Sequence, residues 1–396
     1  MPAHDHLKAE AGANGEFKRQ GNAFTTPFGD APGELPVEAG RYRLIVGKLC
    51  PWAHRQLIVR ELLGLTDAIS VGVVDPIRGE NGWEFTLDPG GVDPVLGIHE
   101  LREAYLAADP GYDRRPTVPA VVDLTTGAVV QNDYHRLTHY WETAWAPLHA
   151  PGAPDLYPAG LRDQIDEISA FVFERVNNGV YRCGFAGSQD AYDAAYERLW
   201  TALDWLEQRL SDRRYLMGES ITEADVRLFT TLARFDPVYH GHFKCNRSKL
   251  AEMPVLWAYA RDLFQTPGFG DTIDFGQIKD HYYKVHRDVN PSGIVPKGPE
   301  LADWLTAIDR SLPDGEPAVL VAHSLGCLAV AGWLAGRSPG TVRGVVLVAP
   351  PDSRGPRFPA AAAPTFVGLD TGPLPVPGLV IVAGGKYTTY RVMAKD

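Results

Sequence analysis

The most constraining feature of this chain is a cysteine followed by a proline at the junction of a strand pattern and a helix pattern. Residues 41–47 form an apolar run typical of a strand, and residues 56–63 carry apolar side chains at helical spacing. Cys50 is therefore expected at the first turn of a helix, with Pro51 as a favourable first helical residue. Unpaired amides and the positive end of the helix dipole favour a thiolate at this position. The pattern predicts a nucleophilic cysteine.

The alternative is a buried, inert thiol, because a free cysteine packs like a small hydrophobic residue. A redox dithiol would have a second cysteine three residues on, and Ala53 stands there instead. A mixed disulfide on Cys50 must then be released by a thiol from solution. His54 and Arg55, one turn further on, add positive charge, but His54 is interpreted as a helix-surface residue without a proton-transfer role.

Length and charge limit the classes of function. The 396 residues allow two or three domains, and the net charge of −11 argues against a nucleic-acid partner. No apolar run approaches the length of a membrane span, so no membrane partner is expected. The four cysteines are far apart in the sequence and lack zinc-type spacing, so we expect no metal and a reducing, cytoplasmic location.

The first part of the chain shows an α/β pattern. Residues 1–40 are expected to form a loose, partly extended arm, and residues 41–146 a domain that opens with a β-α-β unit ending in a strand at 68–74. Residues 75–115 are expected to be a long polar loop, in which Trp83 and Phe85 either pack or form a lid.

A hairpin completes this first domain. Residues 120–123 and 128–130 have the alternating pattern of paired strands, and Asn132-Asp133 is expected to cap the next helix. This order of elements is thioredoxin-like. In that arrangement the proline before the third strand, here Pro119, is cis and faces the cysteine.

The second part of the chain is helical. Residues 147–160 are rich in proline and are interpreted as a linker, and residues 161–305 as an all-α domain. Thr222 and Asp225 approximate a capping box at the start of one of its helices. Apolar side chains trace one face of each of three further helices, within 161–176, 192–210 and 252–264.

A thioredoxin-like domain linked to an all-α domain resembles the glutathione transferases, and residues 218–225 resemble their helix-capping motif. More specific motifs resemble the Xi class, the glutathionyl-hydroquinone reductases, and the resemblance covers about residues 15–305. These motifs are Cys-Pro-Trp-Ala-His-Arg at 50–55, Asn-Asn-Gly-Val-Tyr at 177–181, the Phe-Asp and Val-Tyr pairs at 235–239, Phe-Lys-Cys-Asn at 243–246, His-Tyr-Tyr at 281–283 and Asn-Pro-Ser-Gly-Ile-Val-Pro at 290–296.

The resemblance implies a substrate and a thiol site. A glutathionylated quinol would lose its glutathionyl group to Cys50, and a second glutathione would release that group as oxidised glutathione. By motif position Trp83 flanks the bound thiol, and the backbone of Val118 pairs with its cysteinyl part. Asp133 and Tyr134 replace the usual Glu-Ser pair that grips the γ-glutamyl group. These departures keep mycothiol or another carrier as an alternative to glutathione.

The resemblance also implies a hydroquinone pocket formed by Tyr181, Tyr239 and Tyr282, with Tyr283 as a neighbour of undecided role. Phenol groups there can polarise or protonate the leaving quinol oxygen. A homodimer is expected by resemblance alone. An omega-like thiol transferase or dehydroascorbate reductase is the neighbouring alternative, and a non-catalytic binding protein of the same fold is the alternative from another class.

The last part of the chain differs in composition. Residues 306–383 resemble an incomplete α/β-hydrolase of the retinoblastoma-binding-protein type, with Ser324 at the nucleophile position. The hydrolase triad runs serine, acid, histidine, and no histidine follows His323, so hydrolase activity is not expected. Residues 384–396 resemble a short piece of glycerol-3-phosphate dehydrogenases, but no dinucleotide fingerprint precedes them and no flavin is expected.

Overall fold

The computed structural model describes residues 10, 12, 14–298, 318–323, 342–348 and 378–381. The chain forms two units, residues 1–296 and residues 297–396. Within the described residues, no helix is both long and apolar enough to cross a bilayer.

A four-stranded sheet in the order β2-β1-β3-β4 organises the first part of unit one. The first two strands run parallel because a helix connects them, whereas β3 is antiparallel to both of its neighbours. This arrangement confirms the predicted β-α-β unit and hairpin. The strands are β1 (Tyr42–Val46), β2 (Ile69–Val73), β3 (Ala120–Asp123) and β4 (Ala128–Gln131).

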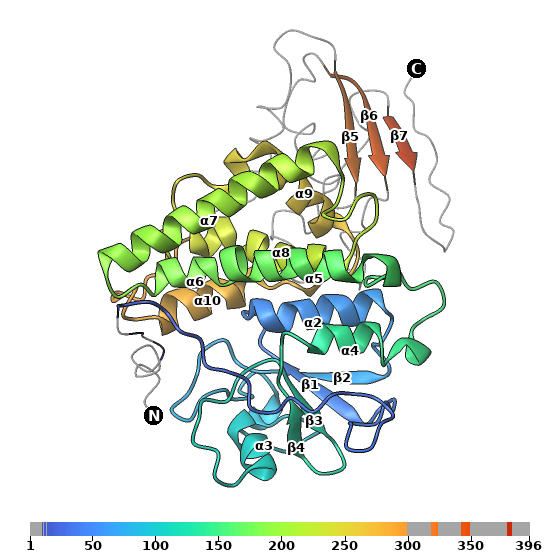
Figure 1. The fold of residues 1–396 in the computed structure, drawn as a ribbon, viewed down its shortest axis with the longest axis vertical. Helices are drawn as coiled ribbons and strands as arrows, with labels where there is room; N and C mark the ends of the chain where they lie inside the picture. The colour runs from blue at the N-terminus through green and yellow to red at the C-terminus, as the bar shows by residue number, and fades with distance from the viewer. Residues whose placement is uncertain are drawn as a thin grey trace. The chain divides into compact units, whose positions relative to one another are not determined.

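Helices cover both faces of this sheet (Figure 1). On one face, α2 (Pro51–Leu62) packs against α4 (Leu137–Glu142). Helix α2 also contacts α8 (Glu223–Arg234), which belongs to the helical layer, the set of helices within residues 162–285. On the other face, α3 (Leu101–Ala108) packs against β4. Buried on both sides, β1 exposes none of its five residues, which explains its continuous apolar pattern.

Helix α3 lies inside the segment that was expected to be a loop. Glu100 and Glu103 form a capping box, and Leu101, Ala104 and Tyr105 face the core at helical spacing. This short helix was missed because the glycines and prolines before it dominate the composition of residues 75–115. Trp83 and Phe85 are packed rather than lid-forming, with exposed fractions of 6% and 0%.

The described N-terminal residues are extended, as expected, but they are packed and not loose. Phe17 and Phe28 are buried, and Thr25 forms an isolated bridge with Gln131 at the edge of the sheet. The side chain of Asn132 accepts hydrogen bonds from the backbone of Ala23 and Phe24. Asn132 is therefore an anchor for this segment and not a helix cap. Asp133 accepts a hydrogen bond from the backbone N–H of His135, in the turn that precedes α4, which begins only at Leu137.

The helical part of unit one contains two π-helical turns, which the sequence analysis did not predict. Residues Phe173–Asn177 form one between α5 and α6, and Phe235–Tyr239 form the other directly after α8. Such turns are frequent at functional sites because they change the direction in which side chains point. The remaining helices are α5 (Arg162–Val172), α6 (Gly179–Gly184), α7 (Gln189–Arg209), α9 (Pro254–Gln265) and α10 (Phe275–Val285).

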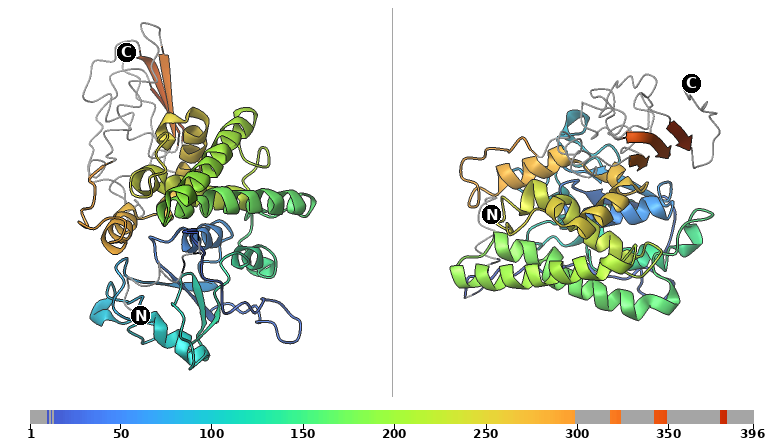
Figure 2. Two further views of the ribbon diagram at one scale, coloured as in Figure 1. Left: turned by 60° about the vertical axis from the view of Figure 1, so that its left-hand side comes forward. Right: turned by 90° about the horizontal axis from the view of Figure 1, so that it is seen from above.

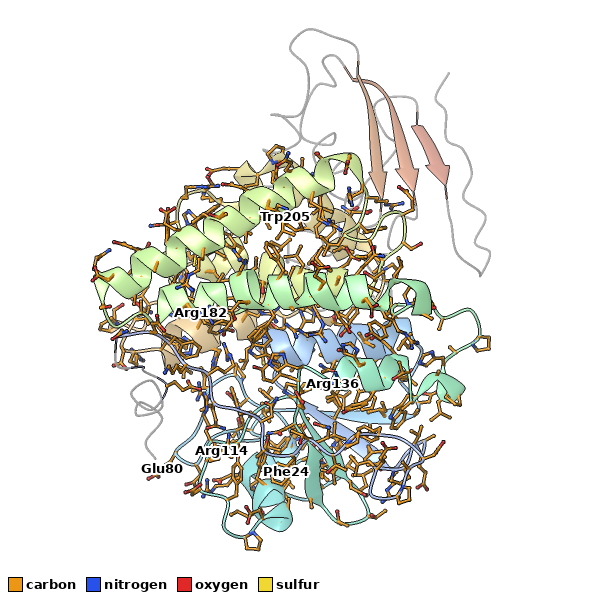
Figure 3. All side chains as sticks on the ribbon, in the orientation of Figure 1. Phe24, Glu80, Arg114, Arg136, Arg182 and Trp205 are labelled. Carbon is orange, nitrogen blue, oxygen red and sulfur yellow. The ribbon has the colours of Figure 1, made fainter. Side chains whose placement is uncertain are left out.

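Figure 2 shows the sheet with its helices and the helical layer as two adjacent parts of unit one. Each long helix in the second part presents an apolar stripe to the common core; the buried side of α7, for example, includes Leu199, Leu203 and Leu206. Trp205 on the same helix points to the surface and is 40% exposed (Figure 3).

Three parallel strands in the order β5-β6-β7 are described in unit two. They are β5 (Ala318–His323), β6 (Val342–Val348) and β7 (Gly378–Ile381). Ser324 and the segment 384–396 lie outside the described residues.

The predicted capping box at the start of α8 is confirmed, because Thr222 and Asp225 exchange side-chain and backbone hydrogen bonds. We expect Thr222→Ala to lower the free energy of unfolding by about 1 kcal/mol, since one helix N–H loses its acceptor. The measurement is the urea midpoint followed by tryptophan fluorescence. Thr201→Ala, at an exposed position inside α7, is the matched control; an equal loss in both variants would contradict the assignment.

Candidate functional site

Cys50 is the N-cap residue of α2, and its side chain is 7% exposed. Its thiol donates a hydrogen bond to the carbonyl oxygen of Val118, with a sulfur–oxygen distance of 3.4 Å. The Val118–Pro119 peptide is cis, which confirms the predicted proline geometry beside the cysteine. The strand-turn-helix connection therefore brings the sulfur to the loop that precedes β3.

Two opposing effects act on the ionisation of this thiol. Burial raises the pKa of Cys50, while hydrogen bonds from the backbone amides of Ala53 and Trp52 and the charges of Arg234 and Arg19 lower it. Burial is the largest effect, so the net shift is upward in this closed pocket. The position of Cys50 in the sequence indicates the helix amides but not the removal of the sulfur from water.

The pocket above Cys50 combines predicted and unpredicted residues. Of the predicted site residues, Trp83, Val118, Tyr134, Tyr181 and Tyr282 line it together with Cys50. The other residues of its lining are Glu10, Phe17, Arg19, Gln20, Asn22, Leu49, Pro51, Trp52, Arg78, Arg115, Pro116, Thr117, Phe185, His281 and His286.

Three of the predicted tyrosines form a hydrogen-bonded group. The hydroxyl oxygen of Tyr282 lies 2.5 Å from that of Tyr181 and 3.1 Å from that of Tyr239. Tyr239 is fully buried behind the other two and does not line the pocket itself. Burial raises the pKa of all three, so their hydroxyl groups stay protonated at neutral pH. Tyr283 is separate from this group and donates to the carbonyl oxygen of Pro237.

Asp133 and Tyr134 lie at the end of the pocket where α4 approaches. Asp133 does not line the pocket; its carboxylate accepts a hydrogen bond of 2.8 Å from the side chain of Asn22. The ring of Tyr134 lies 5.0 Å from that of Trp52 and does line it. Tyr134 is therefore part of the pocket lining. Asp133 is connected to the pocket only through its hydrogen bond to Asn22, which lines the pocket.

The sequence analysis missed the arginines of the pocket. Arg19 lies over the rings of Trp52 and Tyr181, with distances of 4.8 and 4.6 Å to the ring centres. Arg115 forms an ion pair of 2.7 Å with Glu10, and Arg78 lies 5.0 Å from the ring centre of Trp83. All three arginines lie in irregular segments, so neither periodicity nor a motif marked them.

The environment of His54 and Arg55 also differs from the expectation. Both are buried, with exposed fractions of 1% and 0%, so His54 is not a helix-surface residue. Burial, followed by the charge of Arg234, lowers the pKa of His54 well below its usual value. His54 is neutral and adds no charge. Helix α2 lies between the sheet and the helical layer, which explains why all its faces up to Val59 are buried.

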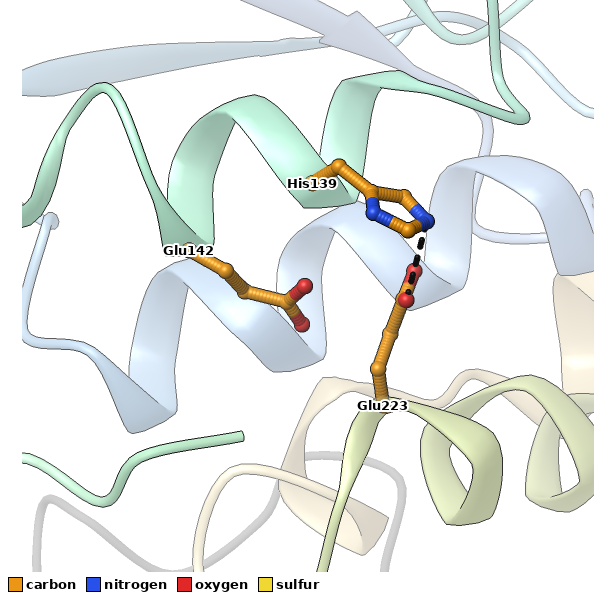
Figure 4. A group of neighbouring side chains, drawn as sticks. All are labelled: His139, Glu142 and Glu223. Atoms are coloured by element: carbon orange, nitrogen blue, oxygen red, sulfur yellow. Dashed lines mark ion pairs between the residues drawn. The ribbon is translucent and has the colours of Figure 1, made fainter. Parts of the chain in front are cut away.

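A second titratable group lies between α4 and α8, away from the pocket (Figure 4). Donor atoms of His139, Glu142 and Glu223 lie within 4.8 Å of one another and are of types that can hold a divalent cation. Arg227 already forms an ion pair with Glu223, and His139 lies 3.2 Å from the other Glu223 oxygen. Neither carboxylate oxygen of Glu142 has a hydrogen-bond partner among the residues that the structure describes, although both are shielded from solvent.

Glu142 is most stable in its protonated, uncharged form. Burial, reinforced by the charge of Glu223, raises its pKa well above the usual value. The pKa of Glu223 is lowered, because Arg227 and His139 together outweigh its burial. We therefore assign this group a structural role in joining the two parts of unit one.

The fold and the site together define a glutathione-transferase-type protein with a cysteine at the start of its first helix. Two family models match the chain: the glutathione S-transferase C-terminal domain over residues 189–262, and serine hydrolase over residues 276–387. The second match begins inside α10 and extends through all three strands of unit two.

Comparisons with whole proteins are more specific. The glutathionyl-hydroquinone reductase YqjG of Escherichia coli is 42% identical over 305 residues, covering 75% of this chain and 93% of that protein. The glutathionyl-hydroquinone reductase PcpF of Sphingobium chlorophenolicum is 46% identical over 264 residues, covering 66% of this chain and 84% of that protein. A crystal structure of a glutathione transferase from Gordonia bronchialis is 66% identical, with a TM-score of 0.67, and covers 68% of this chain and 84% of that one. The chain belongs to the glutathionyl-hydroquinone reductases, the Xi class of glutathione transferases.

The raised pKa of Glu142 makes a prediction about stability. A carboxyl whose pKa is higher in the folded state stabilises the fold at pH values below its unfolded pKa, and this contribution is lost as the pH rises toward the folded value. Glu142→Gln mimics the protonated side chain. We therefore expect the variant to gain stability relative to the parent between pH 5 and pH 8, measured as the difference in urea midpoints.

Glu197→Gln, on the exposed side of α7, is the control for this experiment. If Glu142→Gln and Glu197→Gln show the same pH dependence as the parent chain, Glu142 is ionised in the folded protein and the assignment is wrong.

Proposed function

We propose that this chain reduces glutathionyl-hydroquinones to hydroquinones through a mixed disulfide on Cys50, with glutathione as the second substrate. The observation that carries the proposal is the position of Cys50 at the base of a pocket that also holds the hydroxyl groups of Tyr181 and Tyr282. Family membership supports it, since the two reductases named above share this part of the chain.

In the first step, the Cys50 thiolate attacks the sulfur of the glutathionyl group. A sulfur–sulfur bond forms while the bond between that sulfur and the quinol ring breaks. The electron pair of the broken bond stays with the ring, which takes up one proton and leaves as the hydroquinone. In the second step, the thiolate of a free glutathione attacks the mixed disulfide, which releases oxidised glutathione and restores Cys50.

The second step requires an external thiol because no other cysteine of the described residues is in the pocket. Cys183 and Cys245 are both buried elsewhere, and neither lines the site. A monothiol cycle follows from this arrangement. Its dependence on free thiols suits a reducing compartment such as the cytoplasm.

We assign Tyr181 and Tyr282, which line the pocket, to the hydroquinone. Because their pKa values are raised, they act as hydrogen-bond donors to the quinol oxygen and as a source of the proton, and not as bases. Tyr239 does not face the pocket, so we assign it to the support of Tyr282 through their 3.1 Å contact. This arrangement supplies polar contacts at one place in an otherwise aromatic wall.

We assign the thiol carrier to the part of the pocket lining formed by Trp83, the backbone of Val118 and Tyr134. A glutathione-bound structure of the E. coli relative supports glutathione as the carrier. Mycothiol is the second candidate, because Asp133 is bonded to Asn22 and the aromatic Tyr134 occupies the place of a small residue in the usual Glu-Ser pair. An omega-like thiol transferase or dehydroascorbate reductase, the alternative, would use the same cysteine on a different substrate.

We further propose that the domain boundaries follow the sequence pattern, with domains at 41–146 and 161–305 and a linker at 147–160. We also propose that the chain forms a homodimer. The serine hydrolase match supports a hydrolase-like origin for the segment 306–383.

Cys50 is expected to be the site of adduct formation. Incubation with glutathione disulfide should add one glutathionyl group to the protein, and Cys50→Ala should abolish both the adduct and turnover of glutathionyl-hydroquinone. Intact-mass spectrometry measures the adduct, and Cys183→Ala is the control. If an adduct forms only with mycothiol disulfide, the carrier is mycothiol and not glutathione. If an adduct still forms in Cys50→Ala, the mechanism is refuted. A second measurement separates the reductase from the transferase alternative. It compares the turnover rate with glutathionyl-hydroquinone to the turnover rates with small disulfides and with dehydroascorbate.

Arg78 is expected to bind an anionic group of the thiol. Its Nε has no hydrogen-bond partner, and no ion pair is found for it within the described part of the chain. Burial, followed by the charge of Arg115, lowers its pKa to about 9, so it stays charged at neutral pH. We expect Arg78→Met to raise the KM for glutathione about tenfold, which corresponds to about 1.4 kcal/mol. The exposed Arg136 (Figure 3) provides the control Arg136→Met; equal KM values for the two variants would contradict this role.

A further inference from the structure

Arg234, the last residue of α8, is fully buried, and its guanidinium group reaches the turn that carries Cys50. Its Nε donates to the carbonyl oxygen of Leu49 at 3.1 Å, and Nη2 donates to that of Lys48, also at 3.1 Å. These are the two residues before Cys50. One side chain of the helical layer therefore binds both carbonyl groups that precede the reactive cysteine.

The remaining nitrogen of Arg234 has two contacts. Nη1 donates to the carbonyl oxygen of Thr230, at 2.9 Å, and lies 3.1 Å from Nδ1 of His54. Because the guanidinium can only donate, Nδ1 of His54 is the acceptor and the ring proton lies on Nε2. Nε2 in turn lies 3.0 Å from the hydroxyl oxygen of Thr272, which donates to the carbonyl oxygen of Phe269.

The charge on Arg234 is not neutralised by an acidic side chain. All its acceptors are carbonyl oxygens or the neutral ring of His54, and within the described residues it forms no ion pair. A buried cation without an anionic partner costs free energy, and three carbonyl groups reduce this cost only in part. Such an arrangement stabilises a negative charge that forms nearby.

We propose that Arg234 is a positioning residue for the reaction, which holds the Cys50 turn by its carbonyl groups and places an unneutralised positive charge behind the sulfur. Arg234 does not line the pocket, so it touches neither the quinol nor the thiol carrier. It acts on Cys50 from the protein side, whereas Arg19 and the amides of α2 act from the pocket side. The inference rests on the proposed function in assigning Cys50 as the nucleophile.

Two substitutions separate the charge from the hydrogen bonds. Arg234→Gln removes the charge and retains a polar side chain, whereas Arg234→Lys retains the charge but loses the fork that binds two carbonyl groups at once. The rate of Cys50 alkylation by iodoacetamide is measured as a function of pH in full-length chains that also carry Cys183→Ala. We expect the midpoint of Arg234→Gln to move upward by about one pH unit, and that of Arg234→Lys to move by less than half as much.

Steady-state kinetics give a second measurement, because we expect kcat and KM to respond differently. Both variants are expected to lower kcat for glutathionyl-hydroquinone at least tenfold and to leave KM within about twofold, because the pocket wall is intact. His54→Gln keeps the charge of Arg234 and disturbs only its packing, so its alkylation midpoint should equal that of the parent. This third variant also tests the proposal if Arg234→Gln does not fold.

The proposal is overturned if Arg234→Gln leaves the midpoint unchanged, if Arg234→Lys moves it as far as Arg234→Gln does, or if His54→Gln moves it by a comparable amount. Alkylation does not require turnover. A chain that fails to reduce quinols but shows the expected midpoints would refute the proposed function and retain the role of Arg234.

Discussion

The structure depends on one conflict, between the burial of the Cys50 sulfur and its need to carry a negative charge. A sulfur that is 7% exposed is protected from side reactions, but burial raises its pKa. The opposing contributions come from different parts of the fold. Helix α2 supplies backbone amides, the N-terminal segment supplies Arg19, and α8 supplies Arg234. No single segment of the chain can assemble this set of charges and dipoles.

The helical layer therefore does more than cover the sheet. It binds the turn before Cys50 through Arg234, and it contributes Tyr181 and Tyr282 to the lining of the pocket. The π-helical turn that ends at Tyr239 follows directly after Arg234, so one short stretch both holds the Cys50 turn and supports Tyr282 of the pocket lining. This connection explains how the two parts of unit one act as one site.

The N-terminal segment has a comparable role at the other end of the pocket. Asn22 binds Asp133, Arg19 covers the rings of Trp52 and Tyr181, and Glu10 binds Arg115. Three of these four contacts join residues more than 100 positions apart in the sequence. Charged side chains of the pocket therefore come partly from a segment whose composition indicated only a loose arm.

The sequence by itself determined the elements whose signals are local. The strand-cysteine-proline-helix order, the hairpin, the capping box at Thr222 and the absence of a second cysteine near Cys50 all follow from neighbouring residues, because backbone geometry and helix-end chemistry act over a few positions. The family motifs added Tyr181, Tyr239 and Tyr282. Helix α3 and the late start of α4 were missed, since glycine, proline and Asn132 gave stronger local signals than the short apolar patterns beside them.

Only the tertiary structure decided which charges surround the sulfur. The burial of His54, the unneutralised Arg234, the pocket arginines and the protonated Glu142 depend on side chains brought together from distant segments. Electrostatic energies vary with distance and with access to water, and neither quantity can be obtained from the order of residues along the chain.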